Sequence, residues 1–241
     1  MISVWKRELI GFFKNSTAYL LLAIYAFLSA LFFCLFVMLN NTSYLGNFFG
    51  LWLFIVEIIV VSILSMRFFS EEKKNKTDQL IFTSPVSLSA VVMGKFLGGM
   101  TVFTACTMIN LVYVFIIDLF GTPDAGTNLA NFVGTLLLGS CMISIALFVS
   151  CLTENSVVAA GGTAAAFLLL MLVDFVASFL RALLPQWLQW LPEILQKLNV
   201  FIWYDDFAGG IITLKSVVFY LTFTAIFLFL TVRVLERRRW R

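Results

Sequence analysis

Six apolar runs, each long enough to cross a lipid bilayer, constrain the fold of this chain more than any other feature. They cover approximately residues 19–39, 48–66, 91–119, 132–152, 157–180 and 217–234. A helix needs about 20 apolar residues to cross the hydrocarbon core, where it satisfies its own backbone hydrogen bonds. Only 12% of the residues are charged, against about 25% in soluble domains. The sequence therefore predicts an all-α polytopic membrane protein, with residues 1–241 forming a single transmembrane domain.

The basic residues are distributed unequally over the connections between these runs. Thirteen of the sixteen lie before the first run, from the end of the second run to the start of the third, or at the end of the last run. The other three, Arg181, Lys197 and Lys215, lie between the fifth and sixth runs. Because segments rich in lysine and arginine stay on the cytoplasmic side, we expect both termini and the connection after the second run to be cytoplasmic.

The amphipathic pattern of residues 1–16 predicts a helix that lies along the membrane surface. Apolar side chains share one face of a helical wheel, namely Ile2, Trp5, Leu9, Phe12 and Phe13. The basic residues of this segment lie off that face, where they can meet anionic lipid headgroups. We expect an N-terminal interfacial elbow helix, with a short extension of the first span as the alternative.

The connection between the fifth and sixth runs is unlike an ordinary loop. It contains Trp187, Trp190 and Trp203, with Pro185 and Pro192 as breaks. The segment is too interrupted to span the membrane and too apolar to lie in water. It fits short extracellular helices before the last span that are re-entrant or lie in the interface. The tryptophans form either an aromatic belt or contacts with a substrate.

The chain lacks the residues that several classes of enzyme require. It has no histidine, which excludes HExxH metalloproteases, histidine-ligated metal sites and Ser–His or Cys–His catalytic pairs. It has no GxxxxGK[ST] phosphate loop and so no ATPase motor of its own. Its four cysteines show no CxxC spacing and are typical of buried small apolar side chains. We predict no catalytic residue, cofactor or metal on this chain, and no nucleic-acid partner.

Two acidic residues inside the apolar runs are candidates for a transport pathway or its gating. Glu57 lies in the middle of the second run and Asp174 lies deep in the fifth. A charge at the bilayer centre costs about 2.5–3.5 kcal/mol on insertion scales. Each side chain therefore needs a neutral form, a partner or a polar pathway.

Small residues recur at four-residue spacing in two places. One stripe comprises Ala90, Gly94 and Gly98, and the other comprises Gly161 and Ala165. Such stripes let helix backbones approach closely in lipid, either within one chain or between two protomers.

A charged insert, residues 67–90, separates the second and third runs and carries an ordered set of motifs. It opens with MRFFSEEKK (residues 66–74), continues through Thr77 to LIFTSPVS (residues 80–87), and is followed by Gly94-Lys95-Phe96. This order resembles the segment between the second and third spans of ABC-2 type transporter permeases, commonly MRxFxEEKxxGTxELLLTSPVS…GK. Lys76 stands where that pattern has glycine, and Gln79 stands where it has glutamate. The segments 153–160, 206–212 and 230–240 are similar to the gliding-motility-type branch of these permeases.

The resemblance implies the permease subunit of an ATP-driven ABC exporter in a prokaryotic plasma membrane. ATP and Mg²⁺ would bind to separate nucleotide-binding subunits, and a second permease protomer, identical or different, would complete the pair. The insert would be the coupling segment that docks on an ATPase subunit. Its candidate docking residues are Glu71, Glu72, Lys73, Thr77, Leu80, Ile81, Phe82, Ser84 and Pro85. We expect Glu71 and Glu72 to face water, and Ser87 to cap the helix that starts after it.

Two other functions fit parts of the pattern. A non-transporting membrane anchor for an ATPase or a motility complex would have the same spans and the same docking segment. An intramembrane glutamate protease is suggested by the adjacent Glu71 and Glu72. That chemistry needs a carboxylate pair inside the membrane, whereas this pair is predicted to be cytosolic and is followed by lysines.

Overall fold

The computed structural model describes residues 2–14, 16–39, 53–77, 87–120, 125–183 and 190–239. Within these ranges the secondary structure is helical, with no strand. Six helical segments there are long and apolar enough to cross a membrane: Thr17–Met38, Leu53–Lys74, Leu88–Leu119, Gly126–Leu152, Ser156–Arg181 and Leu214–Arg238. They correspond to the six predicted runs and confirm the all-α fold. Residues 48–52 of the second predicted run lie outside the described residues.

Three spans contain irregular turns. The first is α2 (Thr17–Phe33) followed by the π-helix η1 (Cys34–Met38). The second is α3 (Leu53–Ser65), the π-helix η3 (Met66–Ser70) and α4 (Glu71–Lys74) in direct succession. The third is α6 (Leu88–Thr107) and α7 (Asn110–Phe120), joined by a turn at Met108 and Ile109. The remaining spans are α8 (Ala125–Leu152), α9 (Ser156–Leu183) and α12 (Leu214–Arg239).

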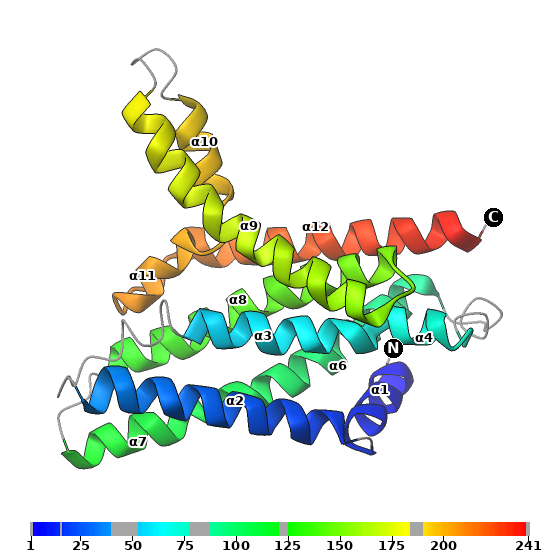
Figure 1. The fold of residues 1–241 in the computed structure, drawn as a ribbon, viewed down its shortest axis with the longest axis horizontal. Coiled ribbons are helices and arrows are strands. Elements are labelled where there is room, and N and C mark those ends of the chain that lie inside the picture. Colours follow the sequence, from blue (N-terminus) through cyan, green and yellow to red (C-terminus); the bar gives the residue numbers. More distant parts are fainter. Residues whose placement is uncertain are drawn as a thin grey trace.

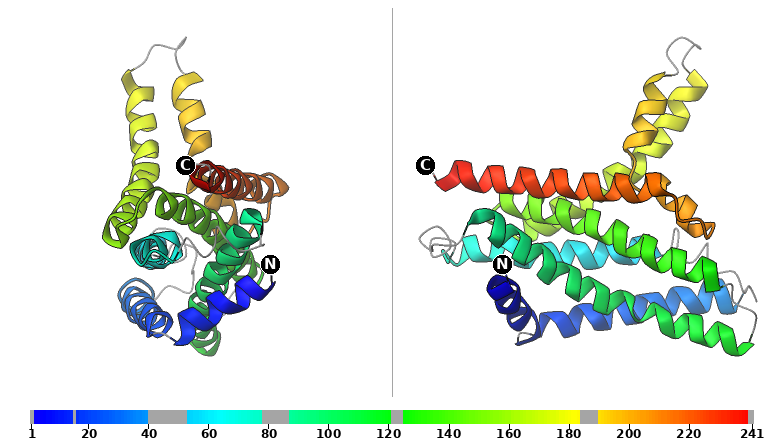
Figure 2. Two further views of the ribbon diagram at one scale, coloured as in Figure 1. Left: turned by 90° about the vertical axis from the view of Figure 1, so that its right-hand side faces the viewer. Right: turned by 180° about the vertical axis from the view of Figure 1, so that it is seen from behind.

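The spans form a bundle in which α3 is the most buried (Figures 1 and 2). The helix α1 (Ile2–Lys14) lies across one end of this bundle. Figure 1 shows α4, α1 and the C-terminal end of α12 at that same end, which we call the α4 end. The start of the insert, α1 and the C-terminal end of α12 thus share one end of the bundle.

The first small-residue stripe joins α1 to α6. A Cβ atom added at Gly94 would lie 2.6 Å from Cγ1 of Val4, and one added at Gly98 would lie 3.1 Å from Cβ of Glu8. Bulkier side chains would therefore push α1 away. The second stripe is open, since a Cβ at Gly161 would meet no atom of the described residues within 4 Å and Ala165 is exposed.

The connection before the last span forms a projection from the bundle. Figure 2 shows α9 bending partway along its length and continuing outward beside α10 (Trp190–Leu198). The chain then returns through the 3₁₀-helix η5 (Ile202–Tyr204) and α11 (Asp205–Ala208). The expected short helices are present. The expected break at Pro192 is wrong, because this residue lies in the first turn of α10, where the missing N–H costs no hydrogen bond.

Replacing Gly94 by alanine is expected to lower the free energy of unfolding by about 1–3 kcal/mol, because the new Cβ overlaps Val4. Gly161→Ala is the matched control and should cost nothing measurable. Denaturant unfolding of the purified chain in detergent measures both. Equal stability of the two variants would contradict the packing of α1 on α6.

Candidate functional site

The candidate site lies at the α4 end, where the second span passes into the insert. The π-helix η3 changes the backbone hydrogen-bonding register just before α4 begins. The N–H groups of Phe69 and Ser70 donate to Oγ of Ser150 on α8, at 3.0 and 3.1 Å. A buried hydroxyl of a neighbouring span thereby stabilises the irregular turn from which α4 extends.

Lys95 of α6 is the centre of the site. Its side chain is 1% exposed, and Nζ lies 3.1 Å from Oε1 of Glu8 and 2.8 Å from Oε1 of Glu72. Nζ also donates to the backbone oxygen of Phe68 at 2.9 Å. An ammonium group has three donors, so this set satisfies all of them. One buried cation therefore joins α1, η3, α4 and α6, and we call Lys95, Glu8 and Glu72 the ionic triad.

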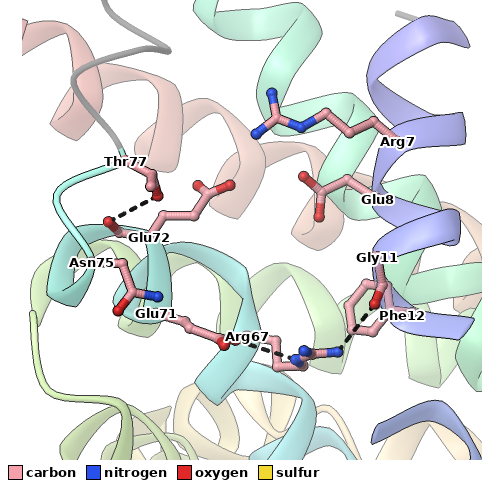
Figure 3. A pocket seen from close by; sticks show the side chains of 9 residues that line it. All are labelled: Arg7, Glu8, Gly11, Phe12, Arg67, Glu71, Glu72, Asn75 and Thr77. Carbon is pink, nitrogen blue, oxygen red and sulfur yellow. Dashed lines mark hydrogen bonds and ion pairs between the residues drawn. The ribbon is translucent and has the colours of Figure 1, made fainter. Parts of the chain in front are cut away.

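A second basic residue reinforces the same junction. Arg67 of η3 pairs with Glu71 of α4 at 3.2 Å and donates to the backbone oxygen of Gly11 at 3.5 Å. Its guanidinium group also lies 5.7 Å from the ring centroid of Phe12. A cavity of about 270 Å³ remains between α1 and the start of the insert, as Figure 3 shows. Most of the residues that line this cavity are charged or polar.

The helix α4 is also attached to the far end of α8. Lys73 is 8% exposed and donates from Nζ to the backbone oxygen of Cys151. Arg238 of α12 donates to the next carbonyl, that of Leu152, at 3.3 Å. Lysine and arginine thus satisfy carbonyl groups that the end of α8 leaves free.

The end of α4 explains why the related pattern has glycine at the position of Lys76. Lys76 has a φ of 55°, in the left-handed region that disfavours side chains. The N–H of Thr77 bonds to the carbonyl of Glu72, and the N–H of Lys76 bonds to that of Lys73. This pair of hydrogen bonds is a Schellman motif, in which glycine is the usual residue at the left-handed position. The backbone keeps the conformation that glycine would favour.

The structure divides the predicted docking residues into two groups. Glu71 is 44% exposed at its side chain and Thr77 is exposed, so both are accessible. Glu72 and Lys73 turn inward, and the expectation that Glu72 faces water is wrong, since its side chain is only 17% exposed. Lys74, Asn75 and Lys76, which lie between Lys73 and Thr77 in the sequence, are also exposed. Leu80, Ile81, Phe82, Ser84 and Pro85 lie outside the described residues. Ser87 caps α6, and its side chain accepts from the N–H of Ala90.

Glu57 lies on α3 and is completely buried. Neither carboxyl oxygen has a hydrogen-bond partner among the described residues. On the adjoining spans, Asn110 donates to the hydroxyl of Tyr25 at 2.8 Å, and Oδ1 of the same asparagine has no partner within the described chain. The interior of the bundle thus contains polar groups that are not paired with one another. Asp174 lies on α9, but its side chain is outside the described part of the structure.

Sequence reasoning did not identify two members of this site. Glu8 is the only acidic residue before Glu57 in the sequence. Its isolation among basic and apolar residues is the one sequence feature that could have indicated its role. Ser150 lies within an apolar run and carried no signal, because serine is common in membrane helices. Lys95 was part of the motif, but its role as the centre of a triad depends on the position of α1.

A helical bundle with six candidate spans, and with a charged segment held against one end by ion pairs, defines a polytopic membrane protein. The family described as ABC-2 family transporter protein matches residues 39–233, and the chain belongs to this family. It is a membrane permease component of an ABC transporter. No curated protein matches the chain significantly. The gliding-motility-type branch stays a prediction.

The ionic triad is expected to behave as one energetic unit. Lys95→Gln should lower the free energy of unfolding by about 3 kcal/mol, because Glu8 and Glu72 are left without their buried partner. The cost of Glu72→Gln should be smaller in the Lys95→Gln background by about 1–2 kcal/mol. Glu71→Gln, at the more exposed pair with Arg67, is the control and should cost less than about 1 kcal/mol. Additive effects of Glu72→Gln and Lys95→Gln in unfolding experiments would contradict the triad.

Proposed function

We propose that this chain is the permease subunit of an ATP-driven ABC exporter, in which α4 transmits movement from separate nucleotide-binding subunits. The observation that carries the proposal is the attachment of α4 to three other helices, α1, α6 and α8. Lys95 joins it to α1 and α6, Ser150 holds η3, and Lys73 contacts the end of α8. A force on α4 would therefore move several spans together rather than bend one of them.

The accessible side of the insert supports the docking role. Glu71, Lys74, Asn75, Lys76 and Thr77 remain at least partly exposed after the inward-facing side chains are paired. Charged residues around a short helix suit a groove on a partner protein. The apolar patch and turn predicted at residues 80–85 would extend this surface. ATP and Mg²⁺ would bind to the partner, and both termini of this chain would be cytoplasmic in a prokaryotic plasma membrane.

The open small-residue stripe of α9 supports a pair of permease protomers. Gly161 and Ala165 are exposed, with no described atom within 4 Å of a Cβ placed at Gly161. In lipid, exposed glycine and alanine at this spacing allow another helix to approach closely. The second protomer would be identical or different.

Glu57 and Asp174 remain candidates for the pathway or its gating. A buried carboxyl group without a partner is costly in lipid, which favours a role in a second conformation of the bundle. A non-transporting anchor remains the alternative function. It would share the docking surface, but it would not need Glu57.

The docking role predicts that Glu71→Lys combined with Lys74→Glu reduces recovery of the ATPase subunit by about tenfold, because charge complementarity at the exposed surface is reversed. The measurement is co-purification of the tagged permease with a phosphate-loop ATPase from its native cells. Asp118→Lys, an exposed charge reversal on α7, is the control and should leave recovery unchanged. Failure of the unaltered permease to recover that ATPase would refute the proposal.

The gating role predicts that Glu57→Gln reduces ATP turnover of the reconstituted complex about tenfold while expression and ATPase recovery stay normal, because glutamine cannot ionise. Ser62→Ala removes a buried polar group from the same helix and serves as the control. Normal ATP turnover of the Glu57→Gln variant would contradict a gating role for Glu57. Turnover insensitive to both variants and to every exported compound would favour an anchor.

A further inference from the structure

A second cavity, of about 490 Å³, lies where the α9–α10 projection meets the start of α12. Arg181, Lys197 and Lys215 all line it. These are the only basic residues between Lys95 and Arg233 in the sequence. They come from three different helices or helix ends, yet they meet at one place. A general excess of basic surface does not explain this, because the rest of this long stretch has no lysine or arginine.

An ordered aromatic side chain supports the cavity. The ring of Trp203 stacks on Phe219 with centroids 4.8 Å apart, and its indole N–H donates to the backbone oxygen of Lys197 at 3.0 Å. Nζ of Lys215 lies 4.9 Å from the centroid of Trp203. Arg181 is hydrogen-bonded to Gln196 of α10. Each basic residue is therefore linked to a structured part of the wall.

The acidic residues of the cavity do not cancel this charge. Glu193 and Asp206 also line it. Oδ2 of Asp206 accepts hydrogen bonds from the hydroxyls of Thr213 and Ser216, at 2.8 and 2.9 Å. These two hydroxyls already solvate one oxygen of the carboxylate. Three cationic side chains face two carboxylates, which leaves the cavity with a positive excess.

We propose that this cavity binds the phosphate headgroup of an anionic phospholipid. Arginine and lysine are the side chains that bind phosphate by charge-assisted hydrogen bonds. The volume lies within the roughly 300–1,000 Å³ of small-molecule sites.

A lipid is favoured over a soluble anion by the apolar side chains exposed on the two helices of the projection, α9 and α10, which also contribute Arg181 and Lys197 to the cavity. Phe179 and Leu183 of α9 are 58% and 64% exposed, and Trp190 and Ile194 of α10 are 55% and 49% exposed. Exposed apolar side chains on helices that also carry a charged site are typical of a membrane interface, where acyl chains would cover them. The site requires neither an ATPase subunit nor transport, so it is independent of the proposed function.

Native mass spectrometry of the full chain in detergent tests the site with phosphatidylglycerol as the probe. The unaltered chain should bind phosphatidylglycerol more tightly than phosphatidylcholine, whose ammonium group neutralises the phosphate. Lys197→Gln should weaken binding of phosphatidylglycerol about tenfold, because one charge-assisted contact is lost. Arg181→Gln combined with Lys197→Gln and Lys215→Gln should abolish the preference. Arg233→Gln, at an exposed arginine near the C-terminal end of α12, is the matched control and should bind normally.

Three results would overturn the proposal. These are unchanged binding by Lys197→Gln and the triple variant, equal affinity for the two lipids, and binding of glycerol phosphate as tight as that of the lipid. The last result would assign the cavity to free phosphate esters. Lys197→Arg keeps the charge and should retain binding, which separates loss of charge from loss of structure. If the triple variant does not fold, comparison of Lys197→Gln with Lys197→Arg is sufficient to test the proposal. Lys197 is exposed, so neither single substitution should disturb the fold.

Discussion

The burial of one ammonium group, that of Lys95, is the constraint on which the α4 end of this protein depends. An unpaired charge at a site with 1% exposure is strongly unfavourable, so Glu8, Glu72 and the carbonyl of Phe68 must all stay within hydrogen-bonding distance. These groups belong to elements that are far apart in the sequence. Their pairing sets where α1 crosses the bundle and how α4 leaves the second span, and the close approach of α1 to Gly94 and Gly98 completes the junction.

The two ends of the protein are stabilised by different interactions. At the α4 end, ion pairs and side-chain bonds to free carbonyls hold a short charged helix against several spans. The α9–α10 projection instead exposes apolar side chains, and basic residues surround a cavity at its base. This difference suits the two proposed roles, docking of a protein at the α4 end and binding of lipid at the projection. The first contact requires rigidity, and the second requires a surface that solvates both charge and hydrocarbon.

Much of this architecture can be predicted from the sequence, because apolar runs of about 20 residues have few structural alternatives in lipid. The number of spans and the cap at Ser87 were predicted correctly. The orientation of α4 was not. Its four residues, Glu71–Lys74, contain no apolar stripe that would indicate an inner face. The π-helical turn at Met66–Ser70 adds a residue to the register and rotates α4 by about 100° relative to a regular helix. Glu72 consequently points inward, and the partner that receives it comes from α6. The role of Glu8 could not be predicted either, because it depends on the packing of α1 against α6.

We expect the ionic triad to make α1 and α4 one rigid unit. The most direct test is the distance between spin labels at Lys6→Cys on α1 and Lys74→Cys on α4, two exposed positions, in a Cys34→Ser background. Double electron–electron resonance should give one narrow distance distribution that does not change when ATP is added to the complex with the ATPase subunit. Lys95→Gln should broaden it. A broad distribution in the chain with Lys95 intact, or a narrow one that Lys95→Gln leaves unchanged, would contradict the account.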